Sequence, residues 1–338
     1  MLFRMALKYD YPVAWPKARM ASSLGYPGRY NAKFLKPKLG TSKILTHHIA
    51  YNDEILKIFP GDFDEVDTSE FVIKKILQNS GSENSRPKNL PTQKTRKKLY
   101  QFTIIREPFG LMKSTFNYIY PEGQLGLCLR TAKTLKNYLN NYHNTTWSNL
   151  GSPIFCKNSI AYDLGFSASL SEEKDLENMI KDLDERMDLV LILEKYYESL
   201  ILLKEDLGLE FDDIVAFYQN RALMRDQLVD ISKEEVPIFR EKARNAIKAD
   251  TLIYDHFLNI LNKKIENFGV ERMEKEVAYL KQLSKEREEE CGIYELKPDS
   301  SNGGFSSSMR REYDIPRVLI PYHPHDVSVT TLMIKGDV

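Results

Sequence analysis

The sequence predicts an α/β protein with a three-layer core, in which helices flank a parallel sheet, followed by a mainly helical C-terminal part. Residues 100–105 and 188–194 are strongly apolar runs with the length of buried strands. Helical patterns follow both runs, and strands that alternate with helices pair in parallel through crossover connections. Residues 237–290 are helical in pattern almost throughout, which predicts the C-terminal part.

The N-terminal region predicts only short elements. Residues 2–8 carry apolar positions at helical spacing, residues 43–51 form a β-compatible run, and residues 53–59 suit a short helix. His47 and His48 belong to this run, and we expect them at or just beyond the C-terminal end of the strand that it forms. Both histidines therefore follow one strand and precede the first buried strand of the sheet.

The segment at residues 78–98 changes composition to Asn, Ser, Gly, Pro, Lys and Arg. Its second half, from Arg86 to Lys98, contains six basic and no acidic residues. A solvated loop inserted into the domain is the expected structure, and a binding arm for an anionic partner is the alternative.

The first buried strand is expected to turn directly into a helix over about residues 109–120. Pro108 suits the first position of this helix, because its missing N–H would have no partner there. Residues 172–187 predict a charged amphipathic helix before the second buried strand. Residues 197–207 predict another helix, which ends at Gly208.

The sequence predicts a separate region at the end of the chain. After Cys291 the sequence is rich in Ser, Gly and Asn, which predicts irregular structure. We therefore expect one domain over residues 1–291 and an irregular tail over residues 292–338.

Composition excludes several classes of protein. The 48 Lys+Arg balance 48 Asp+Glu and 42% of the residues are hydrophobic, so the chain is neither intrinsically disordered nor globally basic like many nucleic-acid binders. Any anion site must therefore be local. The three cysteines, Cys128, Cys156 and Cys291, can form at most one disulfide and contain no C-x-x-C pair. No window approaches 18 uninterrupted apolar residues, so no transmembrane segment is predicted.

One group of residues carries an identifiable chemistry. Arg106 leaves the end of a buried strand, the edge at which open α/β sheets bind ligands. Ser114 follows on the next helix, with Tyr118 one turn further on the same face. A guanidinium and a hydroxyl in this arrangement can hold one phosphate, with free N–H groups of the helix start beside it. From physics alone, ordinary structural roles for both residues remain open.

The spacing R-x-P-x-x-x-x-x-S-x-x-x-Y at Arg106, Pro108, Ser114 and Tyr118 resembles the 3′-phosphate motif of sulfotransferases that use 3′-phosphoadenosine 5′-phosphosulfate. Further stretches resemble the galactose 3-O-sulfotransferase family in particular; they are residues 42–48, 162–166, 188–204, 217–220 and 254–259. The resemblance implies the sulfotransferase fold, which is similar to that of P-loop nucleoside triphosphate hydrolases. It also implies that Arg106 and Ser114 bind the 3′-phosphate of the donor.

The sequence departs from the family at one important point. The loop that holds the 5′-phosphosulfate in the family, with a Lys-Thr-x-x-Ser-Thr-like sequence, does not occur here. Residues 3–9 resemble the helix that follows this loop. We therefore expect the chain to be N-terminally truncated, with the loop, a stem and a membrane anchor upstream of Met1, and expect the chain as given to transfer sulfate poorly.

Sulfuryl transfer needs a base that accepts the proton of the sugar hydroxyl. The resemblance assigns this role to His48, and histidine titrates near neutral pH. Without the resemblance, a structural role for both His47 and His48 is the more common one. A metal site is disfavoured, because adjacent positions on a strand face opposite ways and no further His or Cys cluster completes a site.

Two residues after the second buried strand leave alternatives open. Glu194 could contact the acceptor or orient a motif residue, or it could simply end the strand towards solvent. Ser199, with Glu198 before it, favours capping of the following helix.

Two functional hypotheses follow. The first is a galactose 3-O-sulfotransferase that acts on a galactosylceramide-like glycolipid or a glycan at the luminal side of the Golgi membrane, without a metal or a nucleic-acid partner. The second is a non-catalytic α/β binding module that retains only the 3′-phosphate half-site. A nucleotide kinase is less favoured, because no Gly-x-x-x-x-Gly-Lys-Ser/Thr loop is present. Asn144 begins an N-glycosylation sequon, which gains meaning only if the chain is luminal and is weak evidence alone.

Overall fold

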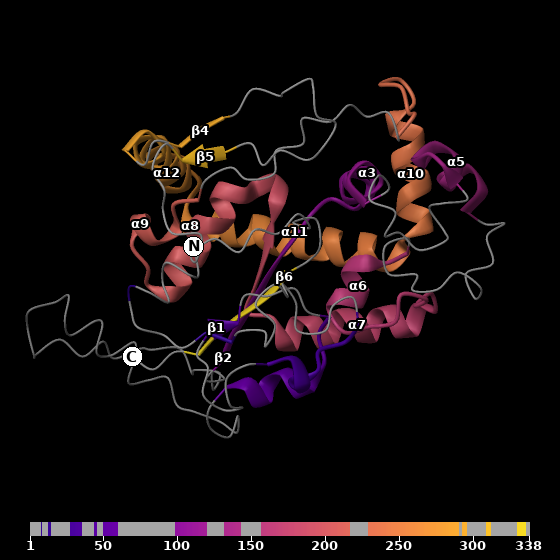
Figure 1. Ribbon diagram of the computed structural model, residues 1–338, viewed down its shortest axis with the longest axis horizontal. Helices are drawn as coiled ribbons and strands as arrows, with labels where there is room; N and C mark the ends of the chain where they lie inside the picture. The colour runs from indigo at the N-terminus through magenta and orange to yellow at the C-terminus, as the bar shows by residue number, and fades with distance from the viewer. Residues whose placement is uncertain are drawn as a thin grey trace, which may run out of the picture.

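The computed structural model describes residues 8, 13–14, 28–35, 44–45, 50–59, 99–119, 132–142, 157–216, 229–290, 293–295, 309–311 and 330–335. Within these ranges the protein is a mixed α/β structure that is mostly helical, with helices around a small sheet (Figure 1). The sheet has the order β1-β6-β2-β3, with bounds Ile44–Leu45, Thr330–Lys335, Leu99–Ile105 and Leu189–Ile192.

The two predicted buried strands, β2 and β3, pair in parallel. The register runs from Phe102 opposite Leu189 to Ile105 opposite Ile192. All four residues of β3 are buried, as expected of a strand covered on both faces. Ile105 and Ile192 are the last residues of the two parallel strands and lie opposite each other. The residues that follow β2 and β3 therefore leave the sheet at the same edge.

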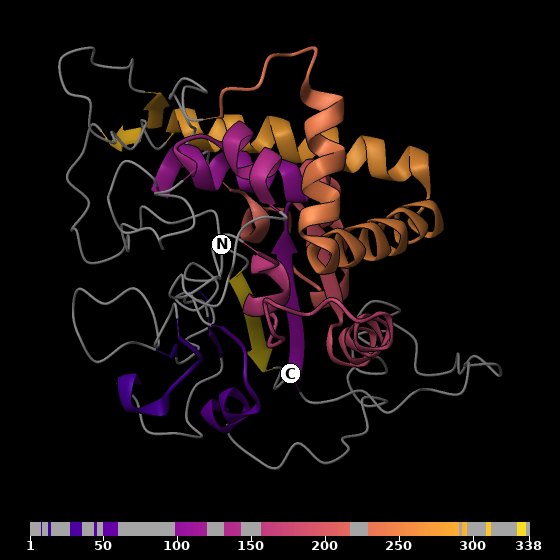
Figure 2. The same cartoon turned by 90° about the vertical axis from the view of Figure 1, so that its right-hand side faces the viewer.

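The sheet is not purely parallel, which corrects the predicted topology. Strand β6 lies between β1 and β2 and runs antiparallel to both, and Figure 2 shows it in yellow beside the purple β2. Two further short strands, β4 (Ile293–Glu295) and β5 (Met309–Arg311), also pair antiparallel. These strands lie in the tail that the sequence predicts to be irregular. Thr330–Lys335 is β-branched and apolar, but its partners lie far away in the sequence and no local pattern reveals them.

The predicted helices are largely confirmed. The helix after β2 begins at Pro108, and the helix after β3 ends before Gly208, whose φ of 63° is the left-handed conformation that glycine favours. The helices are η1 Ala32–Phe34, η2 Asp53–Ile58, α3 Pro108–Ile119, α5 Leu135–Asn141, α6 Ser159–Asp163, α7 Glu173–Arg186, η7 Leu193–Lys195, α8 Tyr196–Leu207, α9 Phe211–Ile214, α10 Val236–Ala246, α11 Lys248–Phe268 and α12 Val270–Glu290.

Helix α3 packs between two hydrophobic clusters. Phe109, Met112 and Phe116 join α5 and α10 in one cluster, and all three side chains are buried. Leu111 joins the larger cluster that contains β2, β3, α7, α8 and α11. Figure 1 shows α3 and α10 on the same side of the molecule, with α11 running from α10 towards the sheet. The remaining face of α3, which includes Gly110 and Ser114, is only partly buried.

Helices α6 and α11 are joined at their N-termini by reciprocal hydrogen bonds. The buried carboxylate of Asp250 accepts from the N–H groups of Ile160 and Ala161, at 3.2 and 2.9 Å. In return, Asn158 Oδ1 accepts from the N–H group of Ala249 at 3.2 Å. Because these bonds satisfy N–H groups at the start of both helices, they fix α11 against α6.

Candidate functional site

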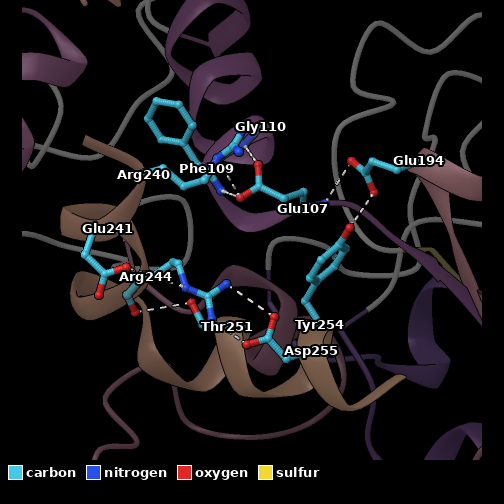
Figure 3. Close-up of polar contacts among 10 residues, drawn as sticks. All are labelled: Glu107, Phe109, Gly110, Glu194, Arg240, Glu241, Arg244, Thr251, Tyr254 and Asp255. Atoms are coloured by element: carbon cyan, nitrogen blue, oxygen red, sulfur yellow. Dashed lines mark hydrogen bonds and ion pairs between the residues drawn. The ribbon is translucent and has the colours of Figure 1, made fainter. Parts of the chain in front are cut away.

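The candidate site lies where β2 and β3 end (Figure 3). Arg106 and Glu107 connect β2 to α3, while Glu194 follows β3 by two residues. The sheet register places both connections at one edge, since Ile105 pairs with Ile192. This is the edge at which parallel strands of α/β proteins present ligand-binding residues.

Glu107 caps the helix that it precedes. Its carboxylate accepts hydrogen bonds from the N–H groups of Phe109, at 3.3 Å, and Gly110, at 2.8 Å. Pro108 has no N–H, and the N–H group of Glu107 itself donates to Glu194 Oε1 at 3.1 Å. The first turn of α3 therefore has every backbone donor paired.

This pairing corrects one expectation from the sequence. The predicted phosphate site included free N–H groups at the start of the helix, but the Glu107 carboxylate occupies those of Phe109 and Gly110. A carboxylate at this point takes up the favourable end of the helix dipole, and a second anion there would be repelled. An anion bound beside α3 would have to be held by side chains.

Arg106 supplies such a side chain. It is partly buried, and no hydrogen bond or ion pair joins it to another residue that the structure describes. Its guanidinium lies against the first turn of α3, because a Cβ atom at Gly110 would be only 3.3 Å from Arg106 Nε and 3.8 Å from Nη2. Glycine at position 110 thus allows the arginine to approach the helix closely.

Ser114 lies on the same face of α3 as Gly110, one turn further along. Four residues correspond to about 6 Å along a helix axis, a separation that one phosphate group can bridge through two of its oxygens. The close approach of Arg106 to Gly110 therefore brings its guanidinium near the face of α3 that carries Ser114. That the two side chains hold one phosphate stays a prediction. Tyr118 is in α3 as well, but its side chain lies outside the described residues.

Glu194 contacts the connection between β2 and α3 at Glu107, the residue between Arg106 and Pro108 of the motif. One carboxylate oxygen accepts from the N–H group of Glu107, and the other accepts from Tyr254 Oη at 3.2 Å (Figure 3). Tyr254 is a buried residue of α11. Burial, with the nearby Glu194 carboxylate as the second cause, raises the pKa of Tyr254 well above its ordinary value, so its hydroxyl remains a donor.

Arg240 of α10 approaches the same helix start from the opposite side to Glu194. Its Nε lies 3.8 Å from Glu107 Oε1, and its guanidinium carbon is 5.8 Å from the centre of the Phe109 ring. About half of the Arg240 side chain is exposed, so this ion pair contributes little to stability. The sequence did not predict this contact, because α10 is distant along the chain and has no motif that marks Arg240.

The part of the sequence that carries this site matches a known protein family. The sequence profile described as galactose-3-O-sulfotransferase matches residues 91–296, which include Arg106, Ser114, Glu194 and Tyr254. The chain belongs to the galactose-3-O-sulfotransferase family. His48, the base that the resemblance assigns, precedes the matched range.

Individual members of the galactose-3-O-sulfotransferase family show moderate identity to the chain. It is 31% identical over 190 residues to galactosylceramide sulfotransferase of Homo sapiens, covering 56% of this chain and 44% of that protein. The chain is 25% identical over 304 residues to galactose-3-O-sulfotransferase 2 of Homo sapiens, covering 86% of this chain and 63% of that protein. The chain thus spans about half the length of these relatives. No solved structure has significant similarity to the chain.

Several residues that the sequence analysis names lie outside the described residues. They are His47, His48, the three cysteines, Asn144 and the segment 78–98. Within the described part, no group of three or more His, Cys, Asp or Glu side chains could hold a metal ion, and no helix there is long and apolar enough to cross a membrane.

Ser199 has a different role from the predicted helix cap. The N-cap position of α8 is Lys195, so Ser199 lies within the first turn of the helix. Its fully buried hydroxyl accepts from the N–H group of Ile192, at 3.1 Å, and donates to the Ile192 carbonyl at 3.3 Å. Ser199 therefore ties α8 to the end of β3, close to Glu194.

Proposed function

We propose that this protein is a galactose 3-O-sulfotransferase that uses 3′-phosphoadenosine 5′-phosphosulfate as its donor. The observation that carries the proposal is the position of Arg106, a partly buried cation without a partner among the described residues, on the face of α3 that Ser114 shares. Membership of the galactose-3-O-sulfotransferase family supports the same reaction. We propose accordingly that the complete core is the three-layer, P-loop-like sulfotransferase fold, with β6 as an antiparallel addition to its sheet.

The residues present fit the 3′-phosphate of this donor. The guanidinium of Arg106 offers several N–H donors in one plane, which match two phosphate oxygens, and the Ser114 hydroxyl can donate to a third. The neighbouring carboxylates of Glu107 and Glu194 accept hydrogen bonds from other groups with both of their oxygens, so the N–H donors of Arg106 stay available for the phosphate. Their negative charge still weakens anion binding, and the contacts from Arg106 and Ser114 must outweigh it.

The bound donor supplies the sulfuryl group, and this chain's residues would hold it and handle the proton. Arg106 and Ser114 would fix the nucleotide through its 3′-phosphate, away from the reacting sulfur. We propose His48 as the base that accepts the proton of the galactose 3-hydroxyl, because a neutral imidazole is available near pH 7. No metal is needed for this division of roles.

The acceptor is proposed as a galactose-terminated glycolipid or glycan. Two of the relatives aligned above are named for galactosylceramide and for galactose, which supports a galactoside in general. We propose further that the protein acts at the luminal side of the Golgi membrane, as the family resemblance implies.

A non-catalytic binding module is the second candidate function. The observation that favours it is the absence of a Lys-Thr-x-x-Ser-Thr-like loop from the printed sequence, since that loop would hold the donor's 5′-phosphosulfate. Such a module would bind 3′-phosphorylated nucleotides at Arg106 without transferring sulfate.

A sulfate-transfer assay distinguishes the two candidates. The protein, as its transcript encodes it, would be incubated with ³⁵S-labelled donor and a panel of terminal galactosides, including galactosylceramide and lactose. The proposal expects labelled 3-O-sulfogalactose in the unsubstituted protein and its loss in the His48→Ala and Arg106→Ala variants. Nucleotide binding without any labelled product would support the binding module, and unchanged transfer by His48→Ala would exclude His48 as the base.

A further inference from the structure

We infer that Glu194 is a positioning residue for the 3′-phosphate site: held by Tyr254, it fixes Arg106 through the backbone N–H of Glu107. This inference rests on the proposed donor site at Arg106. Glu194 does not contact the donor in this account. It acts through the segment that carries the arginine.

The backbone of Arg106 lies at the end of the β2–β3 ladder. The strand pairing stops at Ile105 and Ile192, and Arg106 is the first residue beyond it. The next backbone donor along the chain, the N–H group of Glu107, is bound by Glu194 Oε1 at 3.1 Å. Pro108 then has no N–H to offer. The backbone of Arg106 is thus held between the ladder on one side and the Glu194 contact on the other.

Glu194 is itself held by Tyr254 of α11. Its other oxygen accepts from Tyr254 Oη at 3.2 Å, and Tyr254 is 7% exposed in the middle of α11. Helix α11 is fixed at its start by the reciprocal bonds between Asp250, Asn158 and α6. An otherwise exposed glutamate is therefore oriented by a rigid element, as a supporting residue of a binding site should be.

The negative charge of Glu194 has an effect on phosphate binding that is opposite in sign to that of positioning. A carboxylate near an anion site weakens anion binding by simple repulsion, so its removal should strengthen the binding of a phosphate. The positioning role predicts the opposite, because loss of Glu194 releases the Arg106 segment. Direct repulsion and positioning can therefore be separated by the direction of a single measured change.

The experiment measures dissociation constants of the 338-residue chain by calorimetry for adenosine 3′,5′-bisphosphate and adenosine 5′-phosphate. Glu194→Ala should raise the dissociation constant of the 3′,5′-bisphosphate by about three- to tenfold, the equivalent of one lost hydrogen bond, and leave that of the 5′-phosphate unchanged. Glu194→Gln keeps an oxygen that can accept from Glu107 and should restore most of the affinity. Tyr254→Phe should give a smaller loss than Glu194→Ala.

Two controls isolate the positioning role from general stability and charge. Glu198→Ala removes a carboxylate one turn away, in α8, and should not weaken binding of the 3′,5′-bisphosphate. In an Arg106→Ala background, Glu194→Ala should have no further effect, since the residue through which it acts is absent. Thermal unfolding of each variant confirms that binding is measured on folded protein, and Glu194→Gln and Tyr254→Phe keep the test valid if Glu194→Ala does not fold.

The outcomes separate this inference from the proposed function. Equal or tighter binding of the 3′,5′-bisphosphate by Glu194→Ala, while Arg106→Ala weakens it, would overturn the positioning role and leave the donor site intact. No preference for the 3′-phosphate in the unsubstituted chain would overturn the donor site itself and the inference with it.

Discussion

The guanidinium of Arg106 lies so close to Gly110 that a side chain at position 110 would disturb it. A Cβ atom there would be 3.3 Å from Arg106 Nε. Gly110→Ala should therefore shift the guanidinium and raise the dissociation constant for adenosine 3′,5′-bisphosphate several-fold. Stability should change by less than about 1 kcal/mol, because alanine's better helix propensity offsets the tighter contacts with Arg106 Nε and with Glu107 Oε2, which is also 3.3 Å from the added Cβ. Calorimetry and urea unfolding of the same variant measure both effects, and unchanged affinity would show that Gly110 does not determine the position of Arg106.

Glu107 should stabilise the protein through its capping hydrogen bonds to Phe109 and Gly110. Glu107→Ala removes both bonds and should lower the free energy of unfolding by about 1 kcal/mol, the usual effect of losing an N-cap. Glu241→Ala is the matched control, since this exposed carboxylate on α10 forms a loose 4.0 Å ion pair with Arg244 and an exposed 3.3 Å hydrogen bond from Asn245, and should matter far less. Equal losses in the two variants, measured by urea unfolding, would contradict the capping role.

Ser199 should stabilise the junction of β3 and α8 through its buried hydroxyl. Ser199→Ala leaves the N–H group of Ile192 without the oxygen that accepts from it and should cost about 1–3 kcal/mol. Ser284 of α12 offers the comparison, because its buried hydroxyl has no hydrogen-bond partner within the described structure. Ser284→Ala should be neutral or slightly stabilising in thermal unfolding, and a loss as large as that of Ser199→Ala would contradict this account.

Asp250 should make stability depend on pH. Burial raises the pKa of Asp250 from 3.8 to about 7, against the opposing hydrogen bonds from Ala161 and Ile160. Between about pH 4 and 7 the Asp250 carboxyl therefore takes up a proton when the chain folds. The contribution of Asp250 to the free energy of unfolding is greatest below about pH 4 and falls as the pH rises to 7.

The Asp250→Asn variant checks this pH dependence. Urea unfolding at pH 5 and at pH 7.5 should show a smaller fall in stability for Asp250→Asn than for the unsubstituted chain. Asp175→Asn, on the exposed side of α7, should behave like the unsubstituted chain. The same fall in all three proteins would show that Asp250 does not titrate in this range.

Local sequence patterns predicted the part of the fold that depends on neighbouring residues. The apolar runs became β2 and β3, and Pro108 begins α3 as its missing N–H suggests. Strand β6 was missed, because its pairing with β2 joins distant parts of the chain. The sequence pattern likewise placed Arg106 directly after a strand and Ser114 on the next helix, as the structure does.

The rest of the site depends on contacts that spacing cannot reveal. The hydrogen bond from Tyr254 to Glu194 joins residues of α11 and the end of β3, and the sequence left the role of Glu194 open. The expected free N–H groups at the start of α3 were wrong, because Glu107 turns its carboxylate back onto them. A glutamate directly before a proline at a helix start was the available signal for that cap.

The central claim, that Arg106 binds the donor's 3′-phosphate, is tested most directly by comparing two nucleotides in calorimetry. The unsubstituted chain should bind adenosine 3′,5′-bisphosphate about tenfold or more tightly than adenosine 5′-phosphate, the effect of one charge-assisted hydrogen-bonded contact. The preference should disappear in Arg106→Ala and persist in Arg240→Ala, which removes an exposed arginine nearby. Equal affinity of the unsubstituted chain for both nucleotides, or an undiminished preference in Arg106→Ala, would contradict the account.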